Sequence, residues 1–261
     1  MYPERFSHLP EYAFPRLRAL LDGHNFVGPQ YNMTIGEPQH LYPLWIKDVL
    51  LDHIDGFNRY PANDGIEKLQ TSIVDWFYKR FGVALSSNKN ILPVNGTREG
   101  LYNVSMALCP EKLSDSQPFV LIPNPFYQVY MISALSVNSE PLFISTDEQS
   151  GHLPDYFGLK ADILNKTSAA YICSPSNPQG AVATVDYLTA LIELAEKYDF
   201  KIFADECYSE IYRYAPPPGL MQVSEKLGAD PNRVVTFHSV SYTHLRAHET
   251  EADLVCRLLL E

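Results

Sequence analysis

Residues suited to binding an anion follow the apolar run at 91–94. The next segment, 95–99, has the sequence Asn-Gly-Thr-Arg-Glu and leads into a helical pattern. Gly96 allows the backbone to approach a ligand closely, and the free N–H groups at a helix start favour negative charge. The Thr97 hydroxyl adds a further donor. The segment predicts a small anion site, with a simply capped helix start as the alternative interpretation.

Four more apolar runs end near side chains that could hold a flat, positively charged ring. Tyr127 offers a surface for stacking, and Asn177 offers an amide donor next to prolines that restrict its backbone. Asp205 directly follows four strand residues, where a carboxylate is costly to bury unless a cation such as a protonated ring nitrogen meets it. Tyr208 comes three residues later, and Ser239 ends the last run. Core packing, a turn or a local salt bridge would explain each residue singly, but their order along the chain predicts one shared site.

The apolar runs have the pattern of strands that are buried on both faces. They are short, nearly continuous and bounded by turn residues. They cover residues 91–94, 119–123, 141–145, 169–174, 201–206 and 234–239. Helical patterns alternate with them, so the sequence predicts an α/β fold with a mostly parallel sheet between helices. In such a sheet the carboxyl ends of the strands carry the ligand site.

Three segments have clear helical periodicity. They are residues 64–81, 97–108 and 185–199. We expect Asp64 to cap the first helix and Thr184 to cap the third. The apolar face expected on the third helix consists of Leu188, Leu191, Ile192 and Ala195.

The composition is that of an acidic globular protein. The 261 residues include 20 Lys and Arg against 31 Asp and Glu, a net charge of −11. This balance argues against a broad nucleic-acid or anionic-membrane surface, and no apolar run approaches the ~20 residues of a membrane span. The four cysteines are far apart in a chain without a secretory signal pattern, which favours reduced thiols and a cytoplasmic location. His244 and His248 have helical spacing, but no further ligand cluster accompanies them, so no metal site is expected.

Taken together, the motifs resemble those of the class I/II aminotransferases of fold type I, which depend on pyridoxal 5′-phosphate (PLP). The similarity runs from about residue 31 to 241, and its most specific parts are SPSNPQG at 174–180 and DECY at 205–208. Several segments resemble, in their amino-acid sequence, the bacterial succinyl-diaminopimelate aminotransferases of lysine biosynthesis. The resemblance implies a homodimeric enzyme that moves an amino group from glutamate to a keto acid, N-succinyl-2-amino-6-oxopimelate.

The resemblance also implies which residues would hold the cofactor phosphate. These are Gly96, Thr97, Arg98 and Ser239. Tyr60 would reach the phosphate that is bound in the partner subunit.

Other matching positions would contact the cofactor ring and the substrate. By resemblance, Tyr127 would stack on the pyridine ring, and Asp205 would pair with its protonated nitrogen. Asn177 and Tyr208 would hydrogen-bond the phenolic oxygen. Gly36 and Asn177 would help to hold the substrate carboxylate.

The chain departs from the family at residue 242. The family pattern continues Ser-x-Ser-Lys, and its lysine binds the cofactor covalently and moves the substrate proton. Tyr242 stands at that position, and no lysine follows Lys226. Tyrosine cannot form that bond, so we assign no catalytic residue and expect the chain to be inactive. Residues 242–261 match nothing in the family and resemble the translated read-through of a sequencing adapter.

The expected domain organisation follows from this comparison. Residues 1–35 would form an N-terminal arm and part of a small domain, and 36–241 an incomplete PLP-binding large domain. Residues 242–261 would be a non-family tail. We expect the fold to stop before the antiparallel strand and the small C-terminal domain, leaving a poorly stable fragment with exposed sheet edges.

Two alternatives to transamination remain open at this point, and a third finds no support in the sequence. The same scaffold could carry another PLP reaction, such as β-elimination or decarboxylation. A catalytically dead paralogue could act as a scaffold protein through its dimer surface. A transcription factor on this scaffold would need a basic DNA-binding domain before Tyr31, and the first thirty residues offer none.

Overall fold

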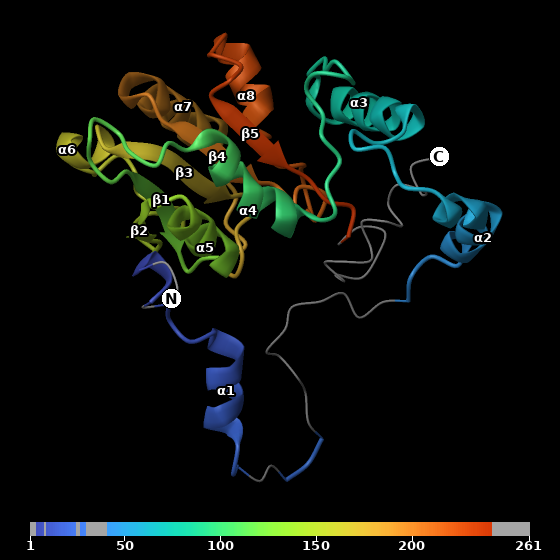
Figure 1. Ribbon diagram of the computed structural model, residues 1–261, viewed down its shortest axis with the longest axis horizontal. Helices are drawn as coiled ribbons and strands as arrows, with labels where there is room; N and C mark the ends of the chain where they lie inside the picture. The colour runs from blue at the N-terminus through green and yellow to red at the C-terminus, as the bar shows by residue number, and fades with distance from the viewer. Residues whose placement is uncertain (1–3, 8, 25–26, 30–40, 242–261) are drawn as a thin grey trace.

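Five parallel strands form one sheet in the order β2-β1-β3-β4-β5 (Figure 1). The computed structural model describes residues 4–7, 9–24, 27–29 and 41–241. The strands are β1 (Phe119–Asn124), β2 (Glu140–Ser145), β3 (Thr167–Cys173), β4 (Lys201–Asp205) and β5 (Val234–Phe237). All neighbouring pairs are parallel. The predicted α/β class with a mostly parallel sheet is confirmed.

The prediction of a strand at 91–94 is wrong. These residues belong to no strand, while the other predicted runs all lie in the sheet. A strand needs a hydrogen-bonded neighbour, and in the described part of the chain the sheet ends at β5 without pairing to 91–94. The apolar pattern was typical of a strand, but it could not show whether a neighbour is present.

Helices cover both faces of the sheet, as buried parallel strands require. The first face carries α4 (Thr97–Leu108) and α5 (Gln128–Ser136), and the second carries α7 (Val185–Tyr198) and α8 (Leu220–Leu227). Side chains along β1 alternate between these two layers, because Val120 and Ile122 pack with the first pair of helices and Leu121 with the second.

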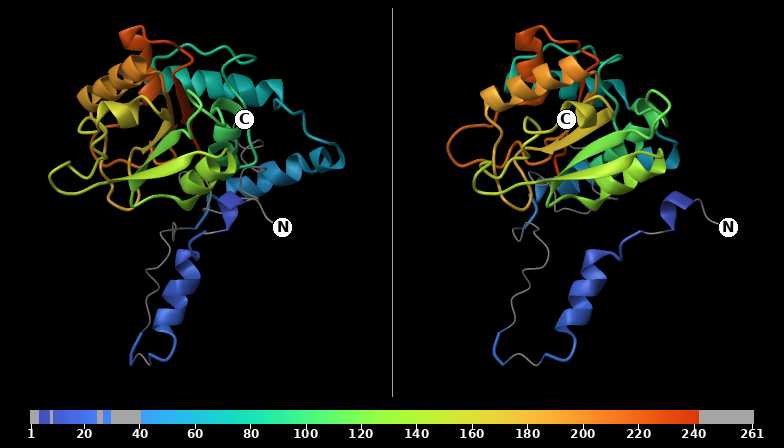
Figure 2. Two further views of the ribbon diagram at one scale, coloured as in Figure 1. Left: turned by 60° about the vertical axis from the view of Figure 1, so that its left-hand side comes forward. Right: turned by 90° about the vertical axis from the view of Figure 1, so that its left-hand side faces the viewer.

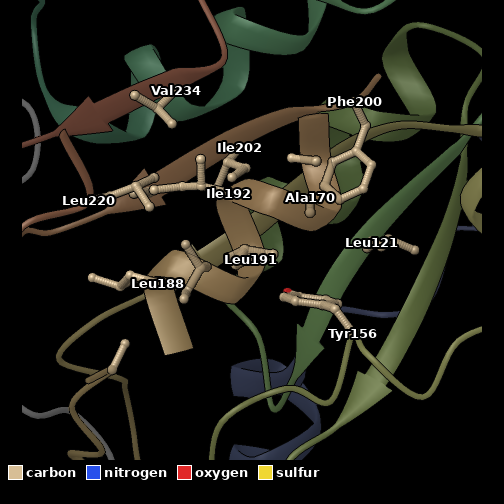
Figure 3. Close-up of a cluster of buried hydrophobic side chains, with 14 of the residues drawn as sticks. Leu121, Tyr156, Ala170, Leu188, Leu191, Ile192, Phe200, Ile202, Leu220 and Val234 are labelled. Atoms are coloured by element: carbon tan, nitrogen blue, oxygen red, sulfur yellow. The ribbon is translucent and has the colours of Figure 1, made fainter. Parts of the chain in front are cut away.

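The α7 side holds the larger core (Figure 3). Leu188, Leu191 and Ile192 are almost completely buried against the sheet, as their spacing predicted. Burial of each such side chain stabilises the folded state by about 1.5–3 kcal/mol relative to leaving it exposed. The Thr184 hydroxyl accepts a hydrogen bond from the Tyr187 N–H at 3.2 Å, which confirms the predicted cap.

Helix α3 (Glu67–Phe81) begins later than predicted, and Asp64 does not cap it. The preceding Gly65 has φ +81, and a Cβ there would lie 2.8 Å from the Pro93 ring. This tight turn keeps Asp64 outside the helix, where its carbonyl oxygen accepts from the Gln70 side chain at 2.7 Å. Near its carboxyl end the helix buries Phe77 and Phe81 in a small cluster of their own.

The remaining described elements are short or lie apart from the sheet. They are η1 (Glu4–Phe6), α1 (Ala13–Leu21), α2 (Trp45–Asp52), η2 (Ile54–Asn58) and α6 (Ala161–Leu164). Helix α1 stands away from the sheet and buries none of its residues (Figure 2). Among the described helices, none has the length and apolarity to cross a membrane.

Candidate active site

The site is built around Asp205, the last residue of β4. Its side chain is buried, with 6% of the residue exposed. The Tyr130 hydroxyl donates to Oδ2 at 2.6 Å, and the Cys207 N–H donates to Oδ1 at 3.3 Å. In the described part of the chain, no Lys or Arg forms an ion pair with this carboxylate. A buried carboxylate with hydrogen bonds but no cation is suited to a cationic ligand.

Tyr130 is held in place by aromatic packing. Its ring stacks on Tyr171 of β3 with centroids 4.5 Å apart, and Tyr171 in turn donates to the Leu101 carbonyl at 2.8 Å. Burial raises the pKa of Tyr130 well above its usual value, and the Asp205 charge adds to this effect. Tyr130 therefore stays protonated and keeps donating to Asp205. The Tyr171 hydroxyl links the strand layer to α4, which fixes the helix relative to the aspartate.

The first turn of α4 has free backbone N–H groups, and the helix lies against β4 and β5 (Figure 1). Gly96, its N-cap, is buried and has φ +119, a conformation that favours glycine. Thr97 opens the helix and is half-buried. Its hydroxyl interacts with Cys207, two residues beyond Asp205. The predicted anion site therefore lies next to the aspartate.

Arg98 and Tyr127 meet at the mouth of the site. The Arg98 Nε donates to the Tyr127 hydroxyl at 2.6 Å. The Tyr127 ring also contacts Tyr130 edge to face, with centroids 5.8 Å apart. Burial raises the pKa of Tyr127, and the hydrogen bond from Arg98 opposes this. Because this contact holds the tyrosine, its ring is positioned without a ligand.

Asn177 and Tyr208 also come together, as predicted for two groups that share one oxygen ligand. The Asn177 amide donates to the Tyr208 hydroxyl at 3.3 Å. Asn177 is exposed and Tyr208 is half-buried. Both line a groove of about 740 Å³ that continues along residues 211–218.

Ser239 follows β5 and pairs locally. Its hydroxyl donates to the Ser241 Oγ at 2.8 Å and accepts from the Ser241 N–H at 3.1 Å. Helix α4 contacts the same strand, because a Cβ on Gly100 would lie 3.0 Å from the Phe237 ring. The packing therefore brings the last strand close to the helix of the predicted anion site.

The other predicted residues lie apart from this group or beyond the described part. Tyr60 is fully exposed, at 101%, and no described contact joins it to the site. Gly36 and Tyr242 lie outside the described residues, as do His244 and His248. No group of three or more metal-ligating side chains occurs among the described residues.

Sequence reasoning missed three residues that the structure brings to the site. Tyr130 had a signal, because it lies three residues after Tyr127 in the aromatic segment that follows an apolar run. Glu206 and His238 had only their positions beside Asp205 and Ser239 to mark them.

The residues present fit PLP by an observation of this structure alone. A protonated ring nitrogen would supply the cation that buried Asp205 lacks, and the α4 amino end would supply donors for a phosphate. The Tyr127 ring connects these two features, because it contacts Arg98 in the first turn of α4 and Tyr130, the donor to Asp205. When bound, the group would supply an electron sink for chemistry at the substrate Cα.

The model of the family "Aminotransferase class I and II" matches residues 29–243, which is most of the chain. The chain belongs to this family. Its members depend on PLP, in agreement with the donor set described above.

Solved structures agree with this assignment. An aminotransferase from Neisseria meningitidis has a TM-score of 0.83 at 30% identity, covering 91% of this chain and 61% of that one. The aminotransferase AspB from Helicobacter pylori has a TM-score of 0.85 at 28% identity, covering 96% of this chain and 72% of that one. These fold-type-I neighbours confirm the fold class expected from the sequence.

The curated relatives share a name. The LL-diaminopimelate aminotransferase of Dehalococcoides mccartyi is 29% identical over 211 residues, which cover 80% of this chain and 53% of that protein. The protein of the same name from Aquifex aeolicus is 27% identical over 251 residues, covering 93% of this chain and 62% of that protein. The chain thus spans between half and two thirds of the length of these relatives.

Proposed function

We propose that this chain carries the PLP-binding part of an aminotransferase that moves an amino group from glutamate to N-succinyl-2-amino-6-oxopimelate in lysine biosynthesis. The observation that carries the proposal is the buried Asp205 carboxylate, which accepts from Tyr130 and lies two residues before Cys207, the contact of Thr97 in the first turn of α4. The names of the curated relatives support a diaminopimelate-type substrate.

Each part of the site has a task in this proposal. Asp205 holds a proton on the ring nitrogen, while Thr97 and the α4 amino end hold the phosphate. Tyr127 covers one face of the ring and excludes water from it. Asn177 and Tyr208 orient the phenolic oxygen. Gly36 and Asn177 bind the substrate carboxylate.

The groove beside Asn177 and Tyr208 supports an acidic acceptor. It extends from these two residues to Arg213, which offers an exposed cation along its wall. A keto acid with a carboxylate at its far end would find a partner there, whereas an apolar side chain would leave the arginine unused.

The proposal includes a domain organisation, a dimer and a location. Residues 1–35 form an arm and part of a small domain, 36–241 the PLP-binding large domain, and 242–261 a tail outside the family. The exposed Tyr60 reaches the phosphate of a partner subunit in a cytoplasmic homodimer. Its complete exposure supports this role, because nothing within its own described chain holds it.

As written, the chain does not turn over, because Tyr242 occupies the position of the family lysine. A Tyr242→Lys variant should restore covalent attachment of PLP. Borohydride reduction followed by peptide mass spectrometry should find the pyridoxyl group at residue 242 of the variant and not of the unmodified chain. Turnover of glutamate and the succinylated keto acid by the unmodified chain would refute the inactivity.

Reversible binding tests the site itself. Asp205→Asn should weaken PLP binding by about tenfold or more, because a charge-assisted hydrogen bond contributes about 1.5–3 kcal/mol. Asp199→Asn is the control, because that carboxylate pairs with Arg233 away from the site. Equal PLP affinity in the two variants would contradict the assignment of Asp205.

Release of ammonia and a keto acid without an acceptor, in the Tyr242→Lys variant, would favour β-elimination over transfer.

A further inference from the structure

A buried acid and a buried imidazole lie directly behind the site. Glu206 follows Asp205 at the end of β4, and His238 precedes Ser239 after β5. The Glu206 N–H donates to the Phe237 carbonyl oxygen at 2.9 Å, so the two strand ends are joined at this point. Each side chain is therefore one residue away from a group predicted to contact the cofactor.

The Glu206 carboxyl group has a fixed orientation. Its Oε1 accepts from the Leu220 N–H at 2.7 Å, in the first turn of α8. Its Oε2 lies 3.3 Å from the His238 Nε2. A Cβ on Gly219 would come within 2.6 Å of the Phe81 ring and 3.3 Å of the same Oε2, so the helix can approach the acid only because residue 219 is a glycine.

Three rings of α3 enclose the imidazole. The Trp76, Phe77 and Phe81 centroids lie 5.3, 5.4 and 5.5 Å from the His238 centroid. Only 17% of the His238 side chain and 4% of the Glu206 side chain are exposed. The contact with Glu206 lacks hydrogen-bond geometry, and within the described residues neither ring nitrogen of His238 has another partner. The ring is therefore located by packing and by the acid.

Burial favours the neutral forms of both groups, and the charges around them have smaller and mixed effects. Arg80 of α3 faces them, but its Nε donates to Glu210 at 2.7 Å. Asp205 faces Glu206 from β4. Burial raises the pKa of Glu206 to about 8, and burial lowers the pKa of His238 to about 3. Near neutral pH the contact thus joins two uncharged groups, which avoids an unpaired buried charge.

The geometry points to Glu206 and His238 as positioning residues that set the distance between the ring-binding aspartate and the phosphate-binding serine. In this inference neither side chain contacts the ring or the phosphate directly. They connect the ends of β4 and β5 to each other, to α8 through the Leu220 N–H and to α3 through its three rings. This inference rests on the proposed function, because it concerns the spacing of two halves of one ligand site.

The test compares a ligand that spans both halves with ligands that occupy only one. PLP bridges the two halves, whereas pyridoxal and inorganic phosphate each bind one. Calorimetric titration of the 261-residue chain should show PLP affinity falling about tenfold or more in Glu206→Ala, with the affinities for pyridoxal and phosphate within about twofold of the unmodified chain. This is the behaviour expected when two intact subsites lose their relative alignment.

Two further variants separate positioning from loss of folding. Glu206→Gln keeps an acceptor for the Leu220 N–H and imitates the neutral acid, so it should restore PLP affinity to within about twofold. Glu196→Gln makes the same change at a carboxylate that accepts from the Asp230 N–H at 3.0 Å, away from the site, and should leave PLP affinity within about twofold. Parallel weakening for all three ligands in Glu206→Ala, or failure of Glu206→Gln to restore PLP binding, would overturn the inference. An unmodified chain that binds none of the three would refute the proposed function and the inference together, whereas unchanged PLP affinity in Glu206→Ala would refute the inference alone.

Discussion

The stability of this chain should depend on pH through Glu206 and His238, and Glu206→Gln should change that dependence. In the folded state the pKa of Glu206 is about 8 against an ordinary 4.5, and burial is the main cause. The pKa of His238 is about 3 against an ordinary 6.5, again through burial. The other charged or polar groups that face the two are Arg80 of α3, Asp205 of β4 and the Leu220 N–H of α8.

The two shifts act on stability in opposite directions. Glu206 keeps its proton on folding, so its contribution is complete below pH 4.5 and is lost as the pH rises toward about 8. His238 loses its proton on folding, so its contribution is complete above pH 6.5 and is lost as the pH falls toward about 3. Between pH 4.5 and 6.5 the two slopes cancel. From pH 6.5 to 8 only Glu206 acts, with a slope of about 1.4 kcal/mol per pH unit, which amounts to about 2 kcal/mol.

Urea unfolding at a series of pH values would measure this effect. Tryptophan fluorescence is a suitable signal, because Trp76 packs against His238. The unmodified chain should lose about 2 kcal/mol of unfolding free energy between pH 6.5 and 8 relative to Glu206→Gln, or about 4–8 °C in melting temperature. Glu196→Gln serves as the control and should follow the unmodified chain, because that carboxylate lies on α7 and accepts from the Asp230 N–H. Parallel profiles for the unmodified chain and Glu206→Gln above pH 6.5 would show that Glu206 is ionised in the folded state, and the reasoning would fail.

Three further substitutions test the site and the core. Tyr130→Phe removes the donor to buried Asp205 and should lower the unfolding free energy by about 1–3 kcal/mol in urea, with weaker PLP binding in calorimetry; Tyr187→Phe, which loses a phenol hydrogen bond away from the site, should leave PLP binding unchanged. Thr184→Ala removes the α7 cap and should lower the unfolding free energy by about 1 kcal/mol, and a Thr184→Ser variant as unstable as the alanine variant would argue against the cap. Leu191→Ala empties part of the larger core and should lower the unfolding free energy by about 2–5 kcal/mol in the same assay, so a loss under 1 kcal/mol would contradict its burial against the sheet.

Local patterns were sufficient for the elements that form the body of the fold. The helix at 97–108 has the predicted bounds, and α7 differs from its prediction by a single residue. Strands β1 and β4 were recognisable because a doubly buried strand must be continuously apolar. Asp64 was misassigned because the chain turns at Gly65 and packs there against Pro93, a residue almost thirty positions away.

The sequence indicated which residues the structure brings close together, but it did not indicate all of the contacts between them. Asn177 and Tyr208 meet, and Thr97 lies near Asp205, as the order of motifs along parallel strands implied. The Tyr130 hydrogen bond was not foreseen, because a tyrosine on an apolar helix face has the same pattern whether it fills the core or donates to a carboxylate.

The sequence by itself determined the class of fold and the family, because apolar periodicity and motif order are written along the chain, and it predicted the strand ends at which a ligand would be held. The resemblance to the family also predicts that Tyr242 stands where the family has its lysine. Tertiary structure alone decided that 91–94 joins no strand and that Glu206 meets His238 inside three rings of α3. These outcomes depend on which distant segments are present as neighbours and on how burial changes the charge of the groups between them, and local sequence specifies neither.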